Sequence, residues 1–140
     1  MILALDSNES REFVSTLDND ETKTIFILGV LDNFVRAKIE DMTTRYSIPQ
    51  NNSTEGTADI QINYNQRNLQ LVRYGLKGWR NFKDAKGVDV IFETIASAEF
   101  GKSYNIISER TIKRLPRNLI NELAVEILND NQISIDDKKK

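Results

Sequence analysis

The chain has 140 residues, of which 39% are hydrophobic and 29% are charged, and its formal net charge is −2. This length suits one small domain with a hydrophobic core, and the near-balanced charge gives no overall attraction to nucleic acid or to a membrane surface. Cysteine and histidine are both absent, which excludes disulfides, thiolate nucleophiles, nitrogen- or sulfur-ligated zinc and proton transfer by histidine. We therefore expect a non-enzymatic protein with no catalytic residues, no cofactor and no metal.

The first part of the chain predicts a strand followed by a helix. Residues 22–31 contain a continuous apolar run rich in β-branched and aromatic residues, which is typical of a buried strand. Asp32 can cap a helix over residues 32–46, where apolar residues recur at helical spacing. Before this strand, residues 2–5 favour a short strand, and residues 10–17 are compatible with either a helix or a strand.

The composition changes along the chain. Residues 47–60 contain a proline, a glycine and many small polar residues, so they cannot bury enough apolar surface to hold one conformation. We expect a mobile polar loop there and a frayed charged tail at residues 134–140, both within a single domain over residues 1–140. Residues 1–70 hold 6 basic and 11 acidic residues, a net of −5, and the rest of the chain holds 13 basic and 10 acidic residues, a net of +3. Such a dipolar chain can stack on copies of itself or dock on a charged partner.

The second part of the chain predicts two helices and short strands. Apolar residues at intervals of three and four predict a helix over residues 66–80, with Trp79 on its buried face. A turn follows, and the alternating residues 88–95 predict a strand. Residues 102–107 favour another strand, and residues 116–130 form the clearest amphipathic helix. Together these elements predict an α+β fold.

A basic patch lies at residues 67–86, where six basic residues and a single acid, Asp84, are interleaved with aromatic residues. Nucleic-acid sites combine phosphate neutralisation with aromatic stacking, so a small nucleic-acid-binding or regulatory protein is one interpretation. If Trp79 is buried, however, the cations on or beside the opposite face of the predicted helix are free for an acidic protein surface. The residues predicted to contact a partner are Arg73, Lys77, Arg80 and Lys83.

Other candidate chemistry is weaker. Residues 96–103, ASAEFGKS, differ from a phosphate-binding loop in having Ala96 instead of the first glycine. The residues that follow favour an extended segment rather than the helix that must face the phosphate, so we expect a simple turn. Adjacent carboxylates such as Glu40 and Asp41 point in different directions on a helix, and the other acidic pairs lie in turns or in the tail.

One stretch resembles a known group of proteins. LVRYGLKGWRNFKDAKGVDVIFE, residues 71–93, is similar to a pattern in small morphogenesis proteins of tailed bacteriophages, including tail-assembly-chaperone-like proteins. In that pattern a short helix ends in a glycine- and tryptophan-containing element, and a turn with aspartate and glycine leads to a strand. Residues 21–42 and 115–134 resemble the early strand and helix and the closing helix of such proteins. The distinctive residues are Gly78, Trp79, Asp84 and Gly87.

The resemblance implies a non-enzymatic role in building or composing a virion, through protein–protein contacts in the head–tail or tail module. Such a protein acts as an assembly chaperone or as a virion-associated structural protein. The expected partners are other phage structural proteins or further copies of the chain, in the host cytoplasm during assembly or in the virion. No membrane association is expected, because the apolar stretch in MILALDSNESREF is far too short for a signal peptide or a membrane span.

Overall fold

The computed structural model describes residues 1–6, 8–47 and 59–130. Within these ranges the chain forms seven strands and four helices, which confirms the predicted α+β class. The elements run in chain order as β1 (Ser10–Phe13), β2 (Ile25–Gly29), α1 (Asn33–Thr43), β3 (Thr44–Ser47), β4 (Asp59–Ile62), α2 (Tyr64–Gly75), β5 (Leu76–Arg80), β6 (Thr94–Glu99), β7 (Lys102–Ile107), α3 (Glu109–Ile112) and α4 (Arg117–Asp130).

The main sheet is antiparallel and has β2 at its centre, with β1 on one side and β5 on the other. The strand predicted over residues 22–31 is confirmed, although it is shorter. Its side chains Phe26 and Leu28 are almost completely buried, because this face of β2 meets the helices. The segment at residues 10–17, left open between helix and strand, forms β1 at its start. No strand forms at residues 2–5.

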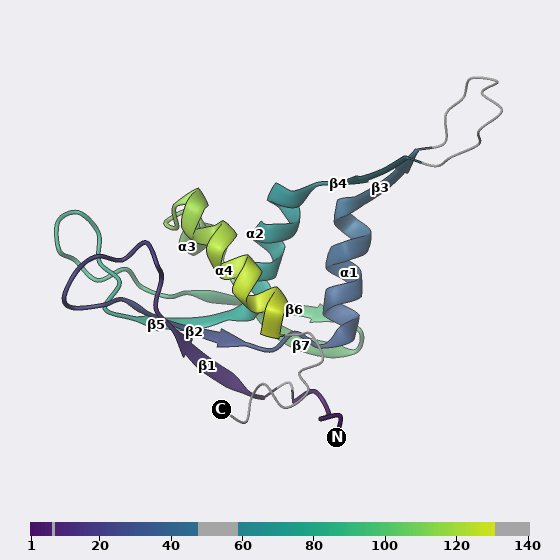
Figure 1. Ribbon diagram of the computed structural model, residues 1–140, viewed down its shortest axis with the longest axis horizontal. Coiled ribbons are helices and arrows are strands. Elements are labelled where there is room, and N and C mark those ends of the chain that lie inside the picture. The colour runs from purple at the N-terminus through teal and green to yellow at the C-terminus, as the bar shows by residue number, and fades with distance from the viewer. Residues whose placement is uncertain (7, 48–58, 131–140) are drawn as a thin grey trace.

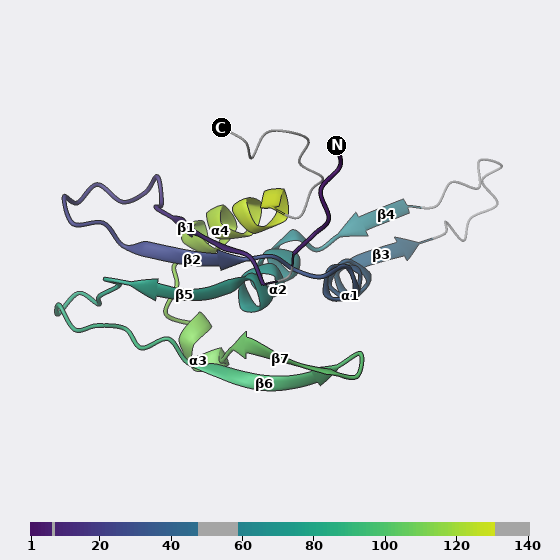
Figure 2. The same ribbon diagram turned by 90° about the horizontal axis from the view of Figure 1, so that it is seen from below.

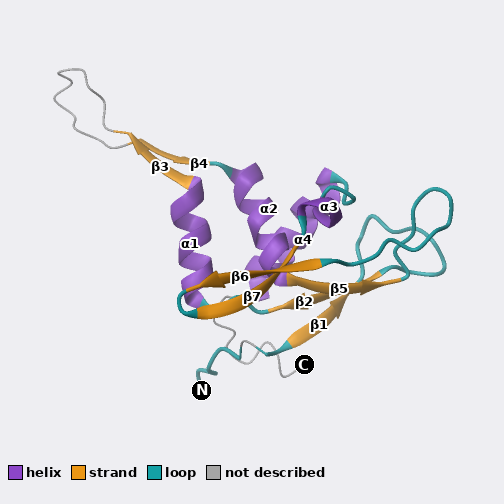
Figure 3. Cartoon of the chain, turned by 180° about the vertical axis from the view of Figure 1, so that it is seen from behind, coloured by secondary structure: helices purple, strands orange, loops and turns teal. Residues whose placement is uncertain are grey.

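Helices α1, α2 and α4 stand side by side over the strands, with α2 in the middle (Figures 1 and 3). The predicted cap of α1 is confirmed, because Asp32 Oδ1 accepts a hydrogen bond of 2.9 Å from the Val35 amide. The predicted closing helix, residues 116–130, is confirmed by α4. Residues from all three helices and from β2, β5 and β7 form the core, which includes Phe26, Leu28, Val35, Ile39, Leu71, Val72, Leu76, Ile106, Ile107, Leu123, Ala124 and Ile127.

The predicted helix over residues 66–80 is wrong beyond Gly75. There α2 ends, and the chain passes directly into β5, which pairs with β2. Gly75 and Gly78 weaken a helix by about 1 kcal/mol each relative to alanine, so pairing with β2 outweighs the helical pattern. The end of α2 also packs closely on α4: a Cβ on Gly75 would lie 2.6 Å from Cγ2 of Ile127. Trp79 packs against the core as expected, but from a strand.

The predicted strand over residues 88–95 is wrong over most of its length, because β6 starts only at Thr94. The backbone amide and carbonyl groups just before β6 form hydrogen bonds outside the strand pair. For example, the Glu93 amide donates to Thr111 Oγ1 at 3.3 Å. The strand predicted at residues 102–107 is confirmed as β7. It forms a tight hairpin with β6, whose turn residues Phe100 and Gly101 have φ angles of 54° and 70°, as a two-residue hairpin turn requires.

The predicted helix over residues 32–46 ends at Thr43, and the chain continues into β3. The β-branched pair Thr43–Thr44 favours this change to extended backbone. With β4, which was not predicted, β3 forms an arm that projects from the end of α1 (Figure 1). The mobile loop predicted at residues 47–60 lies largely outside the described residues, although its first and last residues belong to the arm, and the tail predicted at residues 134–140 lies wholly outside them.

The loops at residues 14–24 and 81–93 lie next to each other at the end of the molecule opposite the arm (Figures 1 and 2). Both loops leave strands of the main sheet, so the sheet positions them.

In the described ranges, the helices are all too short or too polar to cross a membrane.

Candidate functional site

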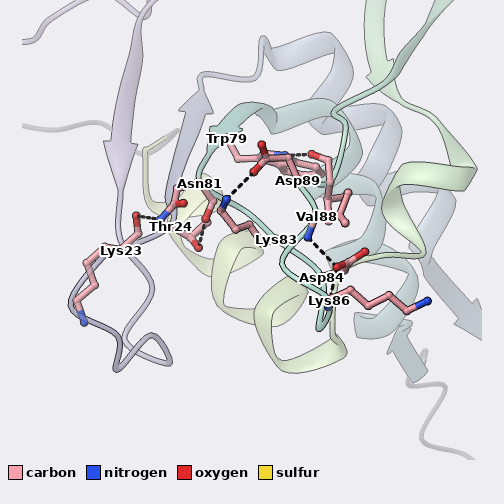
Figure 4. Close-up of polar contacts among 10 residues, drawn as sticks. Lys23, Thr24, Trp79, Asn81, Lys83, Asp84, Lys86, Val88 and Asp89 are labelled. Carbon is pink, nitrogen blue, oxygen red and sulfur yellow. Dashed lines mark hydrogen bonds and ion pairs between the residues drawn. The ribbon is translucent and has the colours of Figure 1, made fainter.

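The 81–93 loop contains most of the motif that resembles the phage proteins, and hydrogen bonds fix both of its ends. It begins at Asn81, whose φ angle of 59° turns the chain out of β5; asparagine tolerates this left-handed conformation better than most residues. The Asn81 carbonyl accepts a hydrogen bond of 2.8 Å from Thr24 Oγ1, and its side chain donates to the Lys23 carbonyl at 3.3 Å (Figure 4). The loop is therefore tied to the neighbouring 14–24 loop.

Asp84 organises the tip of the 81–93 loop. Its Oδ1 accepts hydrogen bonds from the amides of Lys86 and Val88, at 2.9 and 3.0 Å (Figure 4). Its own amide donates to the Val88 carbonyl at 2.9 Å, and its carbonyl accepts from the Gly87 amide at 3.0 Å. Gly87 has a φ angle of +81°, a conformation that glycine adopts without steric cost. Asp84 and Gly87 thus close one tight turn.

Trp79 holds the returning limb of the loop. Its Nε1 donates a hydrogen bond of 2.8 Å to the Val90 carbonyl, and the Val90 amide donates to the Phe82 carbonyl at 2.8 Å. The indole also makes edge contacts with the rings of Phe82 and Phe92, at centroid distances of 4.9 and 4.8 Å. The four motif residues therefore have a common structural role: Gly78 and Trp79 in β5 lead into the loop, and the other two shape its turn.

The fixed loop directs apolar side chains outward. Val88 is 60% exposed and Ile91 is 73% exposed, on a backbone whose neighbouring amides and carbonyls are bonded within the protein. Isolated apolar residues on a surface are common, but a pair of branched side chains on a pre-ordered loop is a favourable geometry for docking a protein. The exposure of these two residues was not expected from the sequence, because the alternating residues 88–95 had indicated a strand.

The adjoining 14–24 loop is also ordered by a carboxylate. Asp18 accepts hydrogen bonds from the amides of Thr24 and Asp20, at 2.9 and 3.1 Å, and these two bonds lower the pKa of the Asp18 side chain. Leu17 in the same loop is exposed. This end of the molecule is therefore built from turns that aspartate side chains stabilise.

The four predicted contact residues do not share a helical face. Arg73, in α2, is partly buried, and its Nε donates to the Ile107 carbonyl at 2.9 Å. Lys77 lies in a cleft on another side of β5, described below. Arg80 forms a salt bridge with Glu12, and Lys83 forms one of 3.4 Å with Asp89, and both pairs are largely exposed. The basic patch seen in the sequence is thus divided among several surfaces and is partly neutralised.

This geometry disfavours the stacking of a nucleic-acid base on Trp79. The rings of Phe82 and Phe92 already pack against the indole, and its Nε1 already donates a hydrogen bond to the Val90 carbonyl. The segment that resembles a phosphate-binding loop, residues 96–103, is the turn of the β6–β7 hairpin together with the adjoining strand ends, so the expected simple turn is confirmed. Across the described ranges, the acidic side chains nowhere gather in a group of three or more that could hold a metal ion.

No protein-family model, curated protein or solved structure matches the chain.

Proposed function

We propose that this protein is a non-enzymatic structural or assembly protein of a tailed bacteriophage, which binds other virion proteins in the head–tail or tail module. It acts in the host cytoplasm during assembly or as part of the virion. Two observations support this proposal, and both concern the motif at residues 71–93. The sequence resemblance supports the phage context, and the geometry of the 81–93 loop supports binding to protein.

The observation that carries the docking role is that one motif both fixes the loop and exposes its apolar side chains. A loop that is already ordered loses little conformational entropy when a partner binds. Val88 and Ile91 can then enter apolar pockets on the partner, as anchor residues do at the centre of protein interfaces. The motif residues would determine the shape of the loop, and the exposed residues would determine the affinity.

Charged residues around the loop would contribute to the rate and specificity of docking. Lys83 lies on the loop and Arg80 lies just before it, so these two of the four predicted cations flank the proposed contact. Their salt bridges with Asp89 and Glu12 are exposed, and exposed pairs contribute only about 0–1 kcal/mol, so either cation can exchange partners at little cost. Charges at the rim of an interface mainly steer association, whereas apolar burial holds the complex.

Co-expression with the head and tail proteins of the same genome tests the proposal. We expect a head or tail protein to co-purify with the wild-type chain, and expect Val88→Asp and Ile91→Asp to abolish this. Val125→Asp is a matched control, because Val125 is similarly exposed but lies on α4. The control should co-purify as the wild type does.

Two results would contradict the proposal. If none of the head or tail proteins co-purifies with the wild-type chain, the assembly role fails. If the wild-type chain is retained on DNA at low salt and is released steeply as salt rises, the nucleic-acid interpretation gains instead. Co-purification that survives both loop variants would leave the phage context intact but remove the 81–93 loop as the contact.

A further inference from the structure

A cleft of about 420 Å³ lies beside the N-terminus of α1, between β5 and the β6–β7 hairpin. This volume falls within the range of small-molecule sites in proteins, about 300–1,000 Å³. The apolar side chains that line the cleft are Val30, Leu31, Val35, Leu76 and Phe92. Its polar lining includes Asp32, Lys77, Lys102, Ser103 and Asn105. The cleft therefore combines an apolar surface with a small set of converging polar groups.

A β-bulge aims Lys77 into this cleft. In the pairing of β2 with β5, Leu28 lies opposite Leu76 and Ile27 lies opposite Gly78, so Lys77 is an extra residue with no partner on β2. Bulges redirect side chains and are frequent beside functional sites.

Glycine at position 29 makes room for the redirected lysine. A Cβ added to Gly29 would lie 2.7 Å from Cε of Lys77, so the stem of the lysine crosses β2 where a side chain is missing. The Lys77 ammonium donates one hydrogen bond, of 2.8 Å, to the Tyr74 carbonyl, and an ammonium can donate three.

The cleft carries a net positive charge. Among the described residues, neither Lys77 nor Lys102 forms a salt bridge. The acid in the cleft, Asp32, accepts a hydrogen bond of 2.6 Å from the Tyr104 hydroxyl and caps α1. Burial opposes ionisation of Asp32, but these hydrogen bonds and the nearby positive charge of Lys102 together outweigh it and lower the pKa of the carboxyl. Two cations and one anion leave a single positive charge for a ligand to neutralise.

The electrostatics of the lysines agree with this geometry. Although Lys77 is exposed along part of its length, burial around the amino group lowers its pKa, and the positive charge of Lys102 lowers it further. A bound anion would relieve both effects, because it would replace lost hydration and screen the two cations from each other. The hydrogen bond to Asp32 and burial raise the pKa of Tyr104 to about 12, so this hydroxyl stays a donor.

We propose that this cleft binds a small monocarboxylate with an apolar body, whose carboxylate lies between the ammonium groups of Lys77 and Lys102. A single negative charge matches the charge of the site better than a phosphate dianion does, because the carboxylate of Asp32 would repel the second charge. The apolar lining would bury the body of the ligand. The cleft shares Phe92 with the 81–93 loop, but Lys77 and Lys102 lie outside that loop, so the site does not depend on the proposed docking role.

Titration of the ¹⁵N-labelled protein with benzoate, followed by amide chemical shifts, tests the proposal. We expect saturable shifts centred on Lys77, Lys102 and Ser103. Benzamide, which has the same ring without the charge, should bind at least about tenfold more weakly, because it loses the charged hydrogen bonds to the lysines. Inorganic phosphate should also bind more weakly than benzoate.

Three variants sharpen this experiment. Lys77→Met keeps the stem but removes the charge, and it should weaken benzoate binding by about tenfold or more. Gly29→Ala keeps every charge but displaces the lysine stem, so it should also weaken binding. Lys86→Met removes an exposed charge on the 81–93 loop and should bind benzoate as the wild type does.

Several results would overturn the assignment. These are shifts that do not saturate or that scatter over the surface, equal binding of benzamide and benzoate, or unchanged affinity in Lys77→Met. The spectra themselves show whether each variant is folded. Loss of benzoate binding with intact co-purification of head or tail proteins would affect this inference alone.

Discussion

Two regions of the protein are stabilised in opposite ways. One is the contact of α2 with α4, and the other is the 81–93 loop. At the helix contact, Gly75 lets the side chain of Ile127 approach the backbone of α2, and Leu123 and Ile127 are completely buried. In the 81–93 loop, backbone hydrogen bonds and the Asp84 side chain maintain the shape, while Val88 and Ile91 face solvent. The helix contact therefore stabilises the fold by burial, whereas the loop packs Phe82 and Phe92 against the core and still presents Val88 and Ile91 as a recognition surface.

The largest effect should come from filling the space at the helix contact. Gly75→Ala places a Cβ 2.6 Å from Cγ2 of Ile127. This methyl carbon is bonded directly to the Cβ of Ile127, so it cannot move far without a shift of the backbone. We expect the free energy of unfolding, measured by urea denaturation, to fall by about 1–3 kcal/mol. Gly78→Ala is the matched control, since its Cβ would meet Ile27 Cδ1 at an ordinary 3.7 Å. Equal stability of the two variants would show that the close approach is unimportant.

A smaller and local effect is expected in the 81–93 loop. Asp84→Ala removes the acceptor for the amides of Lys86 and Val88, so the turn should open more often. The expected loss is about 1 kcal/mol, seen as roughly five- to tenfold faster hydrogen exchange at the Val88 amide. Val88→Ser keeps these bonds and should change stability by less than about 0.5 kcal/mol. If Val88→Ser destabilises the protein more than Asp84→Ala does, Val88 has a packing role and the comparison fails.

The smallest effect concerns Glu122, whose carboxylate links α4 to the 14–24 loop. Burial would raise the pKa of Glu122, but hydrogen bonds from Ser15 and Thr16 outweigh it and lower the pKa below the usual 4.5. A carboxyl with a lowered pKa stabilises the folded state above its unfolded pKa, and this contribution disappears as the pH falls through the folded value.

Urea denaturation of the wild type and of Glu122→Gln, from about pH 7 to about pH 3, checks this sign. The wild type should be the more stable protein at neutral pH, and the difference should shrink in acid. A difference that is constant over this range would mean that the ionised carboxylate makes no special contribution.

Local patterns in the sequence predicted several elements well. The apolar run of β2, the cap at Asp32, the strand at residues 102–107 and the amphipathic helix α4 were all visible, because each depends on residues close together in the chain. The turn at Gly87 was visible for the same reason. The elements that sequence analysis missed or misassigned, β3–β4, β5 and the 88–93 segment, depend on partners distant in the sequence or on bonds within a loop.

The candidate site was predicted only in part. The motif around Trp79 was recognised as distinctive, and the indole packs against the core as expected. The outward direction of Val88 and Ile91 was not foreseen, and neither was the bulge at Lys77. A regular strand buries every second residue, but the bulge at Lys77 places Leu76 and Trp79 opposite Leu28 and Phe26, so a spacing of three looked like that of a helix.

The sequence by itself determined the fold class, the local caps and turns and the lack of cysteine and histidine chemistry, because these follow from side-chain type and near neighbours. Only the tertiary structure decided that Lys77 and Arg80 belong to a strand, and that Arg80 lies near the 81–93 loop whereas Lys77 lies in the cleft. The physical reason is that β5 gains its hydrogen bonds from β2, about fifty residues earlier in the chain, and such a long-range pairing overrides weak local helix propensity.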